Sequence, residues 1–400
     1  MKFEYTAFDG KGFSGPDALF PDPKLMQFIL QYGPDALEAM DKIDGDQEQQ
    51  YLQQLMDAGL LEKVEGENGG KIRLTPRMVR GLQHKALLDI FQEMQRGSKE
   101  GHVSELPGRS AERTEGTKRY EFGDPLSEVE LASTMRNALA RKMASRHGDE
   151  ASGPAGLPLK IGVDDFELNL TEGSGDCATV VLIDQSGSMM RWGRFYHAKR
   201  VALGMAELIR SRFAQDTLDF VGFYSLAQRI AERDLPLVMP KPVSVYDHQV
   251  RIRMPLAQAR GEPGLPQHFT NLQMGLRLAR RILGRRGAAN KQIFVITDGQ
   301  PTAHIESGIE DSQEMLYLLY PPSERTAQTT LREALRCQQQ GIRLATFALV
   351  EDYWGMDWVG FVEQMTRLTH GMAYYCSGES LSSTVIESYL TGRKKKSFIH

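Results

Sequence analysis

A short polar segment, Asp184-Gln185-Ser186-Gly187-Ser188, carries side chains that could hold a metal ion. It follows the apolar run 178–183, which predicts a buried parallel strand ending in a loop. The loop offers one carboxylate and two hydroxyls at alternate positions, and Gly187 allows the backbone to turn tightly. Closely spaced hard oxygen ligands of this kind suit Mg²⁺, with Mn²⁺ as the alternative.

Two later segments carry ligands of the same kind. Thr270 stands just before a helical pattern that begins at Leu272, and Asp298 follows the apolar strand 293–297. In an open α/β sheet, ligand sites gather at the carboxyl ends of strands, so we expect three loops to converge on one ion. A capped turn, in which Asp and Ser bond to their own backbone, would explain the first loop alone but not the agreement of all three.

The order Asp-x-Ser-x-Ser, a distant Thr and a distant Asp-Gly resembles the metal-ion-dependent adhesion site of von Willebrand factor type A (vWA) domains. The resemblance covers roughly residues 160–390 and implies a doubly wound α/β fold, in which helices flank a mostly parallel sheet. It implies metal ligands at Asp184, Ser186, Ser188, Thr270 and Asp298. Many family members have Gly before the Thr-Asn pair where this chain has Phe269, and we expect this residue to narrow the rim of the site.

The resemblance also implies how the ion would be used. In similar proteins the serine and threonine hydroxyls ligate the metal directly, and the carboxylates bind it directly or through water. Two carboxylates only just neutralise Mg²⁺, so the ion would attract an Asp or Glu of a partner. The residues Met189, Met190 and Trp192 follow the metal loop and either form an apolar rim around it or pack beneath it.

A metal-dependent hydrolase is the first alternative, because a bound ion can activate water or clamp phosphates. The chain has no Gly-x-x-x-x-Gly-Lys-Ser/Thr loop, His-Glu-x-x-His pair or Gly-x-Ser-x-Gly turn. His268 and His304 flank two of the metal loops and could serve as bases or ligate a softer metal. Histidines in such places are more often solvated or paired at helix ends, so we predict that the protein is not an enzyme.

The other segments of the C-terminal half alternate between helix and strand patterns, as the doubly wound fold requires. Strands are predicted at 218–224 and 343–350, and an edge strand at 166–170. Helices are predicted near 198–209, 324–340, 358–368 and 381–390, and Gly341 fits a helix C-terminus.

The N-terminal region predicts a helix at 49–58, a hairpin within 62–74, and a second helix that starts at Thr75-Pro76. This order resembles a winged-helix module, so a DNA-binding regulator that uses Lys71 and Arg73 is the second alternative. Residues 1–96 contain 11 Lys and Arg against 16 Asp and Glu, a net charge of −5. Because phosphate binding needs concentrated positive charge, we favour a protein-interaction or packing role.

The composition changes define the expected domain organisation. We predict an N-terminal domain over 1–96, a linker over 97–160 with a helix near 126–145, the vWA-like domain over 161–390, and a basic tail over 391–400. The stretches 97–119 and 148–158 are polar and Gly-rich. The basic tail could contact nucleic acid, an anionic membrane or an acidic partner, and we favour a solvated tail.

The whole chain, with 41% hydrophobic and 25% charged residues, is typical of a soluble globular protein. It has no apolar run long enough for a transmembrane helix and no signal-peptide pattern. Three widely spaced cysteines predict reduced thiols and a cytoplasmic location.

Several further segments strengthen the resemblance to bacterial cytoplasmic vWA proteins that work with MoxR-type or magnesium-chelatase-type AAA+ ATPases. They are Tyr120–Pro125, residues 297–304 and residues 320–323. The resemblance implies a chaperone-like adaptor that docks the ATPase, or its client, through the metal site. The sequence makes no prediction of oligomeric state.

Overall fold

The computed structural model describes residues 23–43, 45–66, 69–98, 113–119, 130–144, 161–171, 176–307, 313–350 and 356–394. The chain divides into two compact units. The first consists of Met1–His102 and Gly175–Gly392, and the second of Val103–Ser174 and Arg393–His400.

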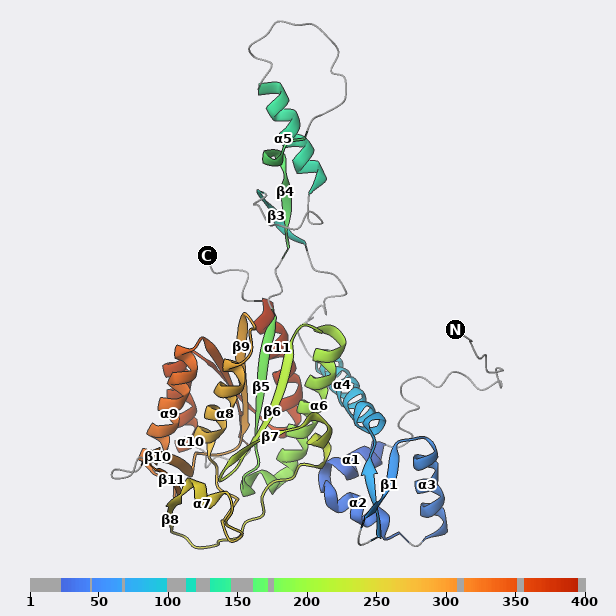
Figure 1. The fold of residues 1–400 in the computed structure, drawn as a ribbon, viewed down its shortest axis with the longest axis vertical. Helices are drawn as coiled ribbons and strands as arrows, with labels where there is room; N and C mark the ends of the chain where they lie inside the picture. Colours follow the sequence, from blue (N-terminus) through green and yellow to red (C-terminus); the bar gives the residue numbers. More distant parts are fainter. Residues whose placement is uncertain are drawn as a thin grey trace, which may run out of the picture. The chain divides into compact units, whose positions relative to one another are not determined.

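The first unit is built on a six-stranded sheet with the order β13-β12-β9-β5-β6-β7. Figure 1 labels β9, β5, β6 and β7 of this sheet. Its strands are β5 (Cys177–Asp184), β6 (Thr217–Phe223), β7 (Ala227–Ile230), β9 (Asn290–Thr297), β12 (Ile342–Leu349) and β13 (Met372–Cys376). All neighbours are parallel except β7, which is antiparallel to β6. β5 is buried along its whole length and lies inside the sheet, as its unbroken apolar run predicts.

Successive residues of β5 point to opposite faces of the sheet, so their side chains belong to two separate apolar cores. Val180 and Leu182 face a cluster shared with α8 (Leu272–Gly284), α9 (Glu324–Gln339) and α10 (Met356–Thr369). Val181 and Ile183 face a cluster shared with α6 (Arg194–Arg212) and α11 (Gly378–Lys394). Helices therefore cover both faces of a mostly parallel sheet, which confirms the predicted doubly wound α/β fold.

Local sequence signals set the starts and ends of these helices. The Asn271 side chain accepts a hydrogen bond from the backbone N–H of Met274 (3.0 Å) and so caps α8. Ser323 caps α9 in the same way through the N–H of Thr326 (3.2 Å). Gly341 follows α9 with a φ of 71°, as predicted for a helix C-terminus.

A second, three-stranded antiparallel sheet that the sequence did not predict adjoins the metal loops. It has the order β10-β11-β8 and is formed by β8 (Val250–Pro255), β10 (Ala303–Ser307) and β11 (Glu314–Tyr320), with the short helix α7 (Leu256–Ala259) after β8. Phe269 is buried in the apolar cluster of this sheet. The expectation that Phe269 narrows the rim of the site is therefore wrong, because its ring packs inward.

The N-terminal part of the first unit contains the predicted helix, hairpin and helix. Its elements are α1 (Pro23–Tyr32), α2 (Pro34–Asp41), α3 (Asp46–Asp57), β1 (Leu61–Gly66), β2 (Gly69–Leu74) and α4 (Pro76–Ser98). Thr75 caps α4 through the N–H of Met78 (3.2 Å), and Pro76 is its first residue, as expected. Whether this region is a true winged-helix module stays a prediction.

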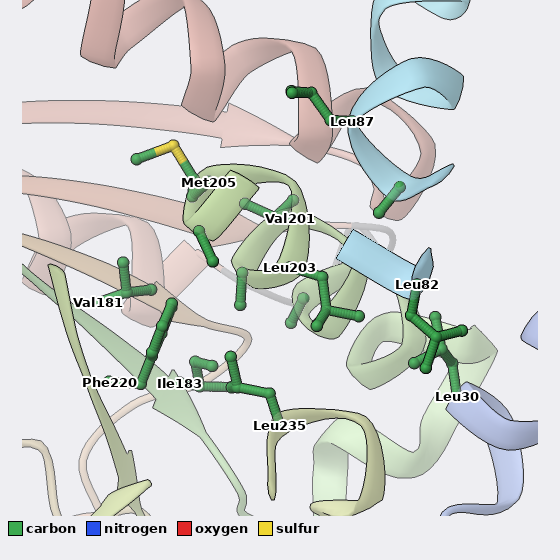
Figure 2. Close-up of a cluster of buried hydrophobic side chains, with 14 of the residues drawn as sticks. Leu30, Leu82, Leu87, Val181, Ile183, Val201, Leu203, Met205, Phe220 and Leu235 are labelled. Carbon is green, nitrogen blue, oxygen red and sulfur yellow. The ribbon is translucent and has the colours of Figure 1, made fainter. Parts of the chain in front are cut away.

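The helix α4 packs directly against α6. Leu30 of α1 and Leu82 and Leu87 of α4 lie in the same apolar cluster as Val201 of α6 and the β5 side chains (Figure 2). A Cβ on Gly204 would lie 2.7 Å from Ile90 Cδ1, so the glycine allows the two helices to approach closely. The N-terminal helices and the central sheet therefore share one continuous core.

The second unit contains a two-stranded sheet and one helix. Its elements are β3 (Arg113–Arg119), α5 (Leu131–Ala144), the short 3₁₀ helix η4 (Val163–Asp165) and β4 (Glu167–Thr171). The predicted strand at 166–170 is present as β4, and it pairs with β3. Residues 113–119, which we expected to be linker, are therefore a strand. The predicted helix near 126–145 is present as α5.

Several other expectations fall on the remaining parts of the chain. Residues 120–125, 148–158 and 395–400 lie outside the described residues. The helix α11 extends to Lys394, so the first residues of the predicted basic tail are helical. Cys177, Cys337 and Cys376 are all buried, and Cys337 and Cys376 are free thiols. Among the described helices, none is both long and apolar enough to cross a bilayer.

Candidate metal centre

The two carboxylates of the predicted site lie at adjacent strand ends. Asp184 is the last residue of β5, and Asp298 follows Thr297, the last residue of β9. These strands are hydrogen-bonded neighbours, and Ile183 pairs with Ile296. Because parallel strands end at the same edge of a sheet, the pairing brings together two acidic residues that are distant in the sequence.

The serine hydroxyls link the two carboxylate loops. Asp184 Oδ1 accepts a hydrogen bond from the Ser186 N–H (2.8 Å), which turns the chain immediately after the strand. The Oγ atoms of Ser186 and Ser188 lie 3.1 Å apart. Ser188 Oγ donates to Asp298 Oδ1 (2.7 Å). Four of the predicted ligands are therefore connected by a continuous chain of hydrogen bonds.

The loop that carries Thr270 is hydrogen-bonded to both of the other loops. The Gly187 N–H donates to the His268 carbonyl (3.1 Å). On the other side, the Thr270 N–H donates to Thr302 Oγ1 (2.8 Å), and the Thr302 N–H donates back to the Thr270 carbonyl (3.0 Å). A Cβ on Gly187 would lie 2.6 Å from Val243 Cγ2 and 3.2 Å from His268 Cβ, so a larger residue would push these side chains away. The three predicted loops thus come together.

Burial raises the free-energy cost of keeping both carboxylates of this group ionised. Asp184 is fully buried, and this burial, with the nearby charge of Asp298, raises the pKa of its carboxyl to about 7. Thr297 Oγ1 donates to Asp184 Oδ2 (2.5 Å) and partly offsets that cost. Two neighbouring buried carboxylates repel each other when both are ionised, and a cation between them would relieve the repulsion.

The donor atoms present fit a small hard cation. Mg²⁺ binds oxygen at about 2.1 Å in an octahedron, so adjacent ligand oxygens stand about 3.0 Å apart. The Ser186–Ser188 and Ser188–Asp298 oxygen separations, 3.1 and 2.7 Å, agree with that edge. Within the described ranges no three His, Cys, Asp or Glu side chains gather around one point, so hydroxyls would have to complete the shell.

The family follows from comparison with known sequences. A family model described as "Rv0959-like protein, vWA domain" matches residues 177–390, which is more than half of the chain. The chain belongs to this family. A second model, "Rv0959-like protein, third domain", matches residues 112–171, the range that holds β3, α5 and β4. The vWA match begins at the first residue of β5 and confirms the predicted vWA fold.

The relatives of this vWA protein include Rv0959 of Mycobacterium tuberculosis and Mb0984 of Mycobacterium bovis, both described as uncharacterized. Each is 28% identical over 383 residues, which cover 96% of this chain and 50% of the relative. The chain therefore spans half the length of the curated relatives it matches.

Solved structures with a similar fold share little sequence with the chain. The PilB minor pilin from Streptococcus sanguinis is 16% identical, with a TM-score of 0.38, over 60% of this chain and 67% of that one. The vWF domain of the pilus tip protein Mfa5 from Porphyromonas gingivalis is 12% identical, with a TM-score of 0.37, over 55% and 96%. At these scores the likenesses carry no argument about function.

The apolar residues after the metal loop of this vWA domain divide between two roles. Met189 is fully buried beneath the loop. Met190 and Trp192 are each 57% exposed beside it. Trp192 and Gly193 have positive φ values of 50° and 68°, and these turn the chain from the 3₁₀ segment η5 (Gly187–Gly193) into α6. Met189 therefore packs beneath the loop, whereas Met190 and Trp192 are exposed next to it, where an apolar rim would lie.

The two candidate histidines have structural partners. His268 Nδ1 accepts from the Ser244 N–H (3.3 Å), and burial lowers the pKa of its imidazole. His304 is buried in β10, where Nδ1 lies 2.8 Å from Thr326 Oγ1 and the ring stacks on Tyr317. Burial lowers the pKa of His304 as well. His304 is thus paired at the start of α9, one of the two roles expected, but it is buried rather than solvated.

Three residues of the site were missed from the sequence. Thr297 donates a hydrogen bond to Asp184, and Thr302 accepts one from the Thr270 N–H. Arg194 Nη1 donates to Asp298 Oδ2 (2.7 Å). A hydroxyl directly after the apolar run 293–296 was a usable signal for Thr297. Nothing in the local sequence distinguishes Arg194 from the other arginines of α6, because its partner lies 104 residues away.

Proposed function

We propose that the vWA domain binds Mg²⁺, with Mn²⁺ as the alternative, through Asp184, Ser186, Ser188, Thr270 and Asp298. The observation that supports this proposal is the group of oxygens, largely shielded from solvent, where three hydrogen-bonded loops meet, with two carboxylates and no basic residue among the predicted ligands. When bound, the ion would supply an electrophilic position for an incoming anion. The ligands of the chain would hold the ion at the strand ends and leave a coordination position for that anion.

In this proposal the centre docks a partner protein through an Asp or Glu side chain and performs no catalysis. Met190 and Trp192 stand exposed beside the metal loop and offer apolar contact to the same partner. The resemblance to vWA proteins that work with MoxR-type AAA+ ATPases supports a cytoplasmic adaptor for such an ATPase or its client. The metal anchors the interface, so the interaction depends on it.

The metal part of the proposal is tested by titrating the protein with Mn²⁺ alone and measuring the free Mn²⁺ by electron paramagnetic resonance. We expect Asp184→Asn to weaken binding by about a hundredfold or more, because it removes a charged ligand while preserving size. Asp234→Asn, an exposed carboxylate of the same unit, is the matched control and should bind Mn²⁺ as the wild type does. Equal affinity in wild type and Asp184→Asn would rule out this centre.

The partner part is tested by affinity capture from a cell lysate, followed by mass spectrometry. Wild type with Mg²⁺ should recover an AAA+ ATPase, and either EDTA or Asp184→Asn should abolish the recovery. Recovery of the ATPase in all conditions would place the docking surface away from the ion. Recovery of no ATPase would remove the support for this class of partner.

A further inference from the structure

Arg194 makes an ion pair with one of the predicted ligands, although it is not itself a member of the ligand set. Its guanidinium donates to Asp298 Oδ2 at 2.7 Å, while Ser188 donates to Oδ1 of the same carboxylate. A single carboxylate therefore joins the arginine to the group of metal-binding oxygens. The side chain of Arg194 is 8% exposed and that of Asp298 is 0% exposed, so water screens this pair very little.

The backbone and a neighbouring ring hold Arg194 in this position. It is the first residue of α6, directly after the two left-handed residues Trp192 and Gly193. The indole of Trp192 lies over the guanidinium, with 4.5 Å between the ring centroid and Cζ. The arginine is therefore fixed against the carboxylate oxygen of Asp298 that Ser188 does not contact.

We propose that Arg194 is a built-in counter-ion of the metal centre that limits its affinity for divalent cations. This inference rests on the proposed function, because it assigns a role to Arg194 at the same centre. A fixed positive charge beside Asp298 already satisfies part of the negative charge that a metal ion would neutralise. It also repels the ion across a poorly screened interior.

A second consequence concerns the anion that the loaded centre would accept. Two carboxylates balance one divalent cation, and Arg194 adds a further positive charge. The loaded centre is then net positive and favours an anionic side chain over a neutral one. Arg194 thus lowers the affinity of the centre for the metal ion and raises its affinity for a partner's carboxylate.

The test is Mn²⁺ titration of Arg194→Gln, Arg194→Lys and the wild type at constant ionic strength. We expect Arg194→Gln to bind Mn²⁺ at least about tenfold more tightly, and Arg194→Lys to stay within about threefold of wild type because it keeps the charge. A purely structural role for Arg194 would give the opposite result, since a disordered site binds metal more weakly.

The matched control is Arg200→Gln. Arg200 is a second buried arginine of α6, and its guanidinium pairs with Glu93 of α4 rather than with a metal loop. The variant has the same change in net charge as Arg194→Gln, and we expect its Mn²⁺ affinity to stay within about twofold of wild type. Tighter binding in both variants would mean that overall charge, and not Arg194, controls the affinity.

Acetate provides the second readout. Added to Mn²⁺-saturated protein, it displaces coordinated water, and the loss is followed by water-proton relaxation. We expect wild type to bind acetate at least about threefold more tightly than Arg194→Gln, because only the wild type keeps the extra charge. Equal acetate affinity in the two proteins would overturn this part of the inference.

The outcomes separate the two proposals. If wild type binds Mn²⁺ and folded Arg194→Gln binds equally or more weakly, the counter-ion role is overturned and the metal centre stands. If no variant binds Mn²⁺, both proposals fail. If Arg194→Gln does not fold, Asp298→Asn is compared with Asp298→Asn/Arg194→Gln, in which no lone charge is left buried. Tighter binding by the double variant supports the role, and equal or weaker binding overturns it.

Discussion

At the scale of single residues, Lys199 shows how strongly this interior opposes a charge. It lies on α6 and is almost completely buried, with Nζ donating to the Pro236 carbonyl (3.0 Å) and lying 3.6 Å from Met239 Sδ. A carbonyl and a thioether solvate an ammonium group poorly. Burial therefore lowers the pKa of Lys199 to about 7.

This shift predicts a pH-dependent stability. An unfolded lysine titrates near 10.5, so between about pH 7 and pH 10 the unfolded chain binds more protons than the folded one. The free energy of unfolding therefore rises with pH in this window. Below about pH 7, Lys199 is charged in the folded protein as well, and its burial destabilises the fold to the full extent. We expect a gain of at least about 1 kcal/mol between pH 7 and pH 9, which Lys199→Met should lack.

Urea unfolding of both proteins at several pH values measures this difference. Lys71→Met, at an exposed position on β2, serves as the control and should follow the wild type. If Lys199→Met shows the same pH slope as wild type, the ammonium group is not the cause. Comparing variants at each pH removes the contribution of other groups that titrate in the window.

At the scale of elements, the metal loops are held in place by contacts that begin the small sheet. Thr302 stands immediately before β10, and its hydroxyl accepts from the Thr270 N–H while its own N–H donates to the Thr270 carbonyl. The loop after β9 is in this way joined to the loop before α8. We infer that the small sheet fixes the distance between the Thr270 and Asp298 loops.

Thr302→Val tests this coupling, because valine has the same shape but cannot accept the hydrogen bond. We expect Mn²⁺ affinity to fall about tenfold, in the range typical of residues that support metal ligands. Thr366→Val is the control: the Thr366 hydroxyl makes a hydrogen bond to the Val362 carbonyl within α10, away from the metal loops. Unchanged affinity in Thr302→Val would show that the loops hold their positions without this bond.

At the scale of the whole molecule, the N-terminal helices and the central sheet of the first unit share one core. Leu82 of α4 is fully buried in the cluster that includes Val181 and Ile183 of β5. Polar contacts add to it: Gln83 Nε2 donates to Glu232 Oε1 (2.8 Å) of the 3₁₀ helix η6 (Glu232–Leu237), and Arg210 donates to Gln83 Oε1 (2.8 Å). We therefore expect the two parts to unfold together.

Leu82→Ala tests this cooperativity. All three tryptophans of the chain, at 192, 354 and 358, lie outside the N-terminal part. We expect the substitution to cost about 2–5 kcal/mol and to lower the unfolding midpoint seen by tryptophan fluorescence as much as that seen by circular dichroism. Leu139→Ala, at an exposed leucine of α5, should shift neither. An unchanged fluorescence midpoint in Leu82→Ala would mean independent unfolding.

The sequence alone determined the elements and the loops that carry the candidate ligands. The run from Ala178 to Ile183 is apolar at nearly every position, so it predicted a strand buried on both faces. The change to polar residues at Asp184 and Asp298 marked the strand ends. These signals are local, because a strand or helix shows its burial in the spacing of its own side chains.

Which of these elements meet depends on contacts between residues that are far apart in the sequence. The pairing of β3 with β4, the sheet β10-β11-β8 and the inward packing of Phe269 depend on partners that are distant in sequence. The contact of Arg194 with Asp298 is of the same kind. An arginine at the start of a helix has the same local pattern whether it faces solvent or a buried carboxylate. The difference lies in the pairing of β5 with β9, which places that carboxylate beside it.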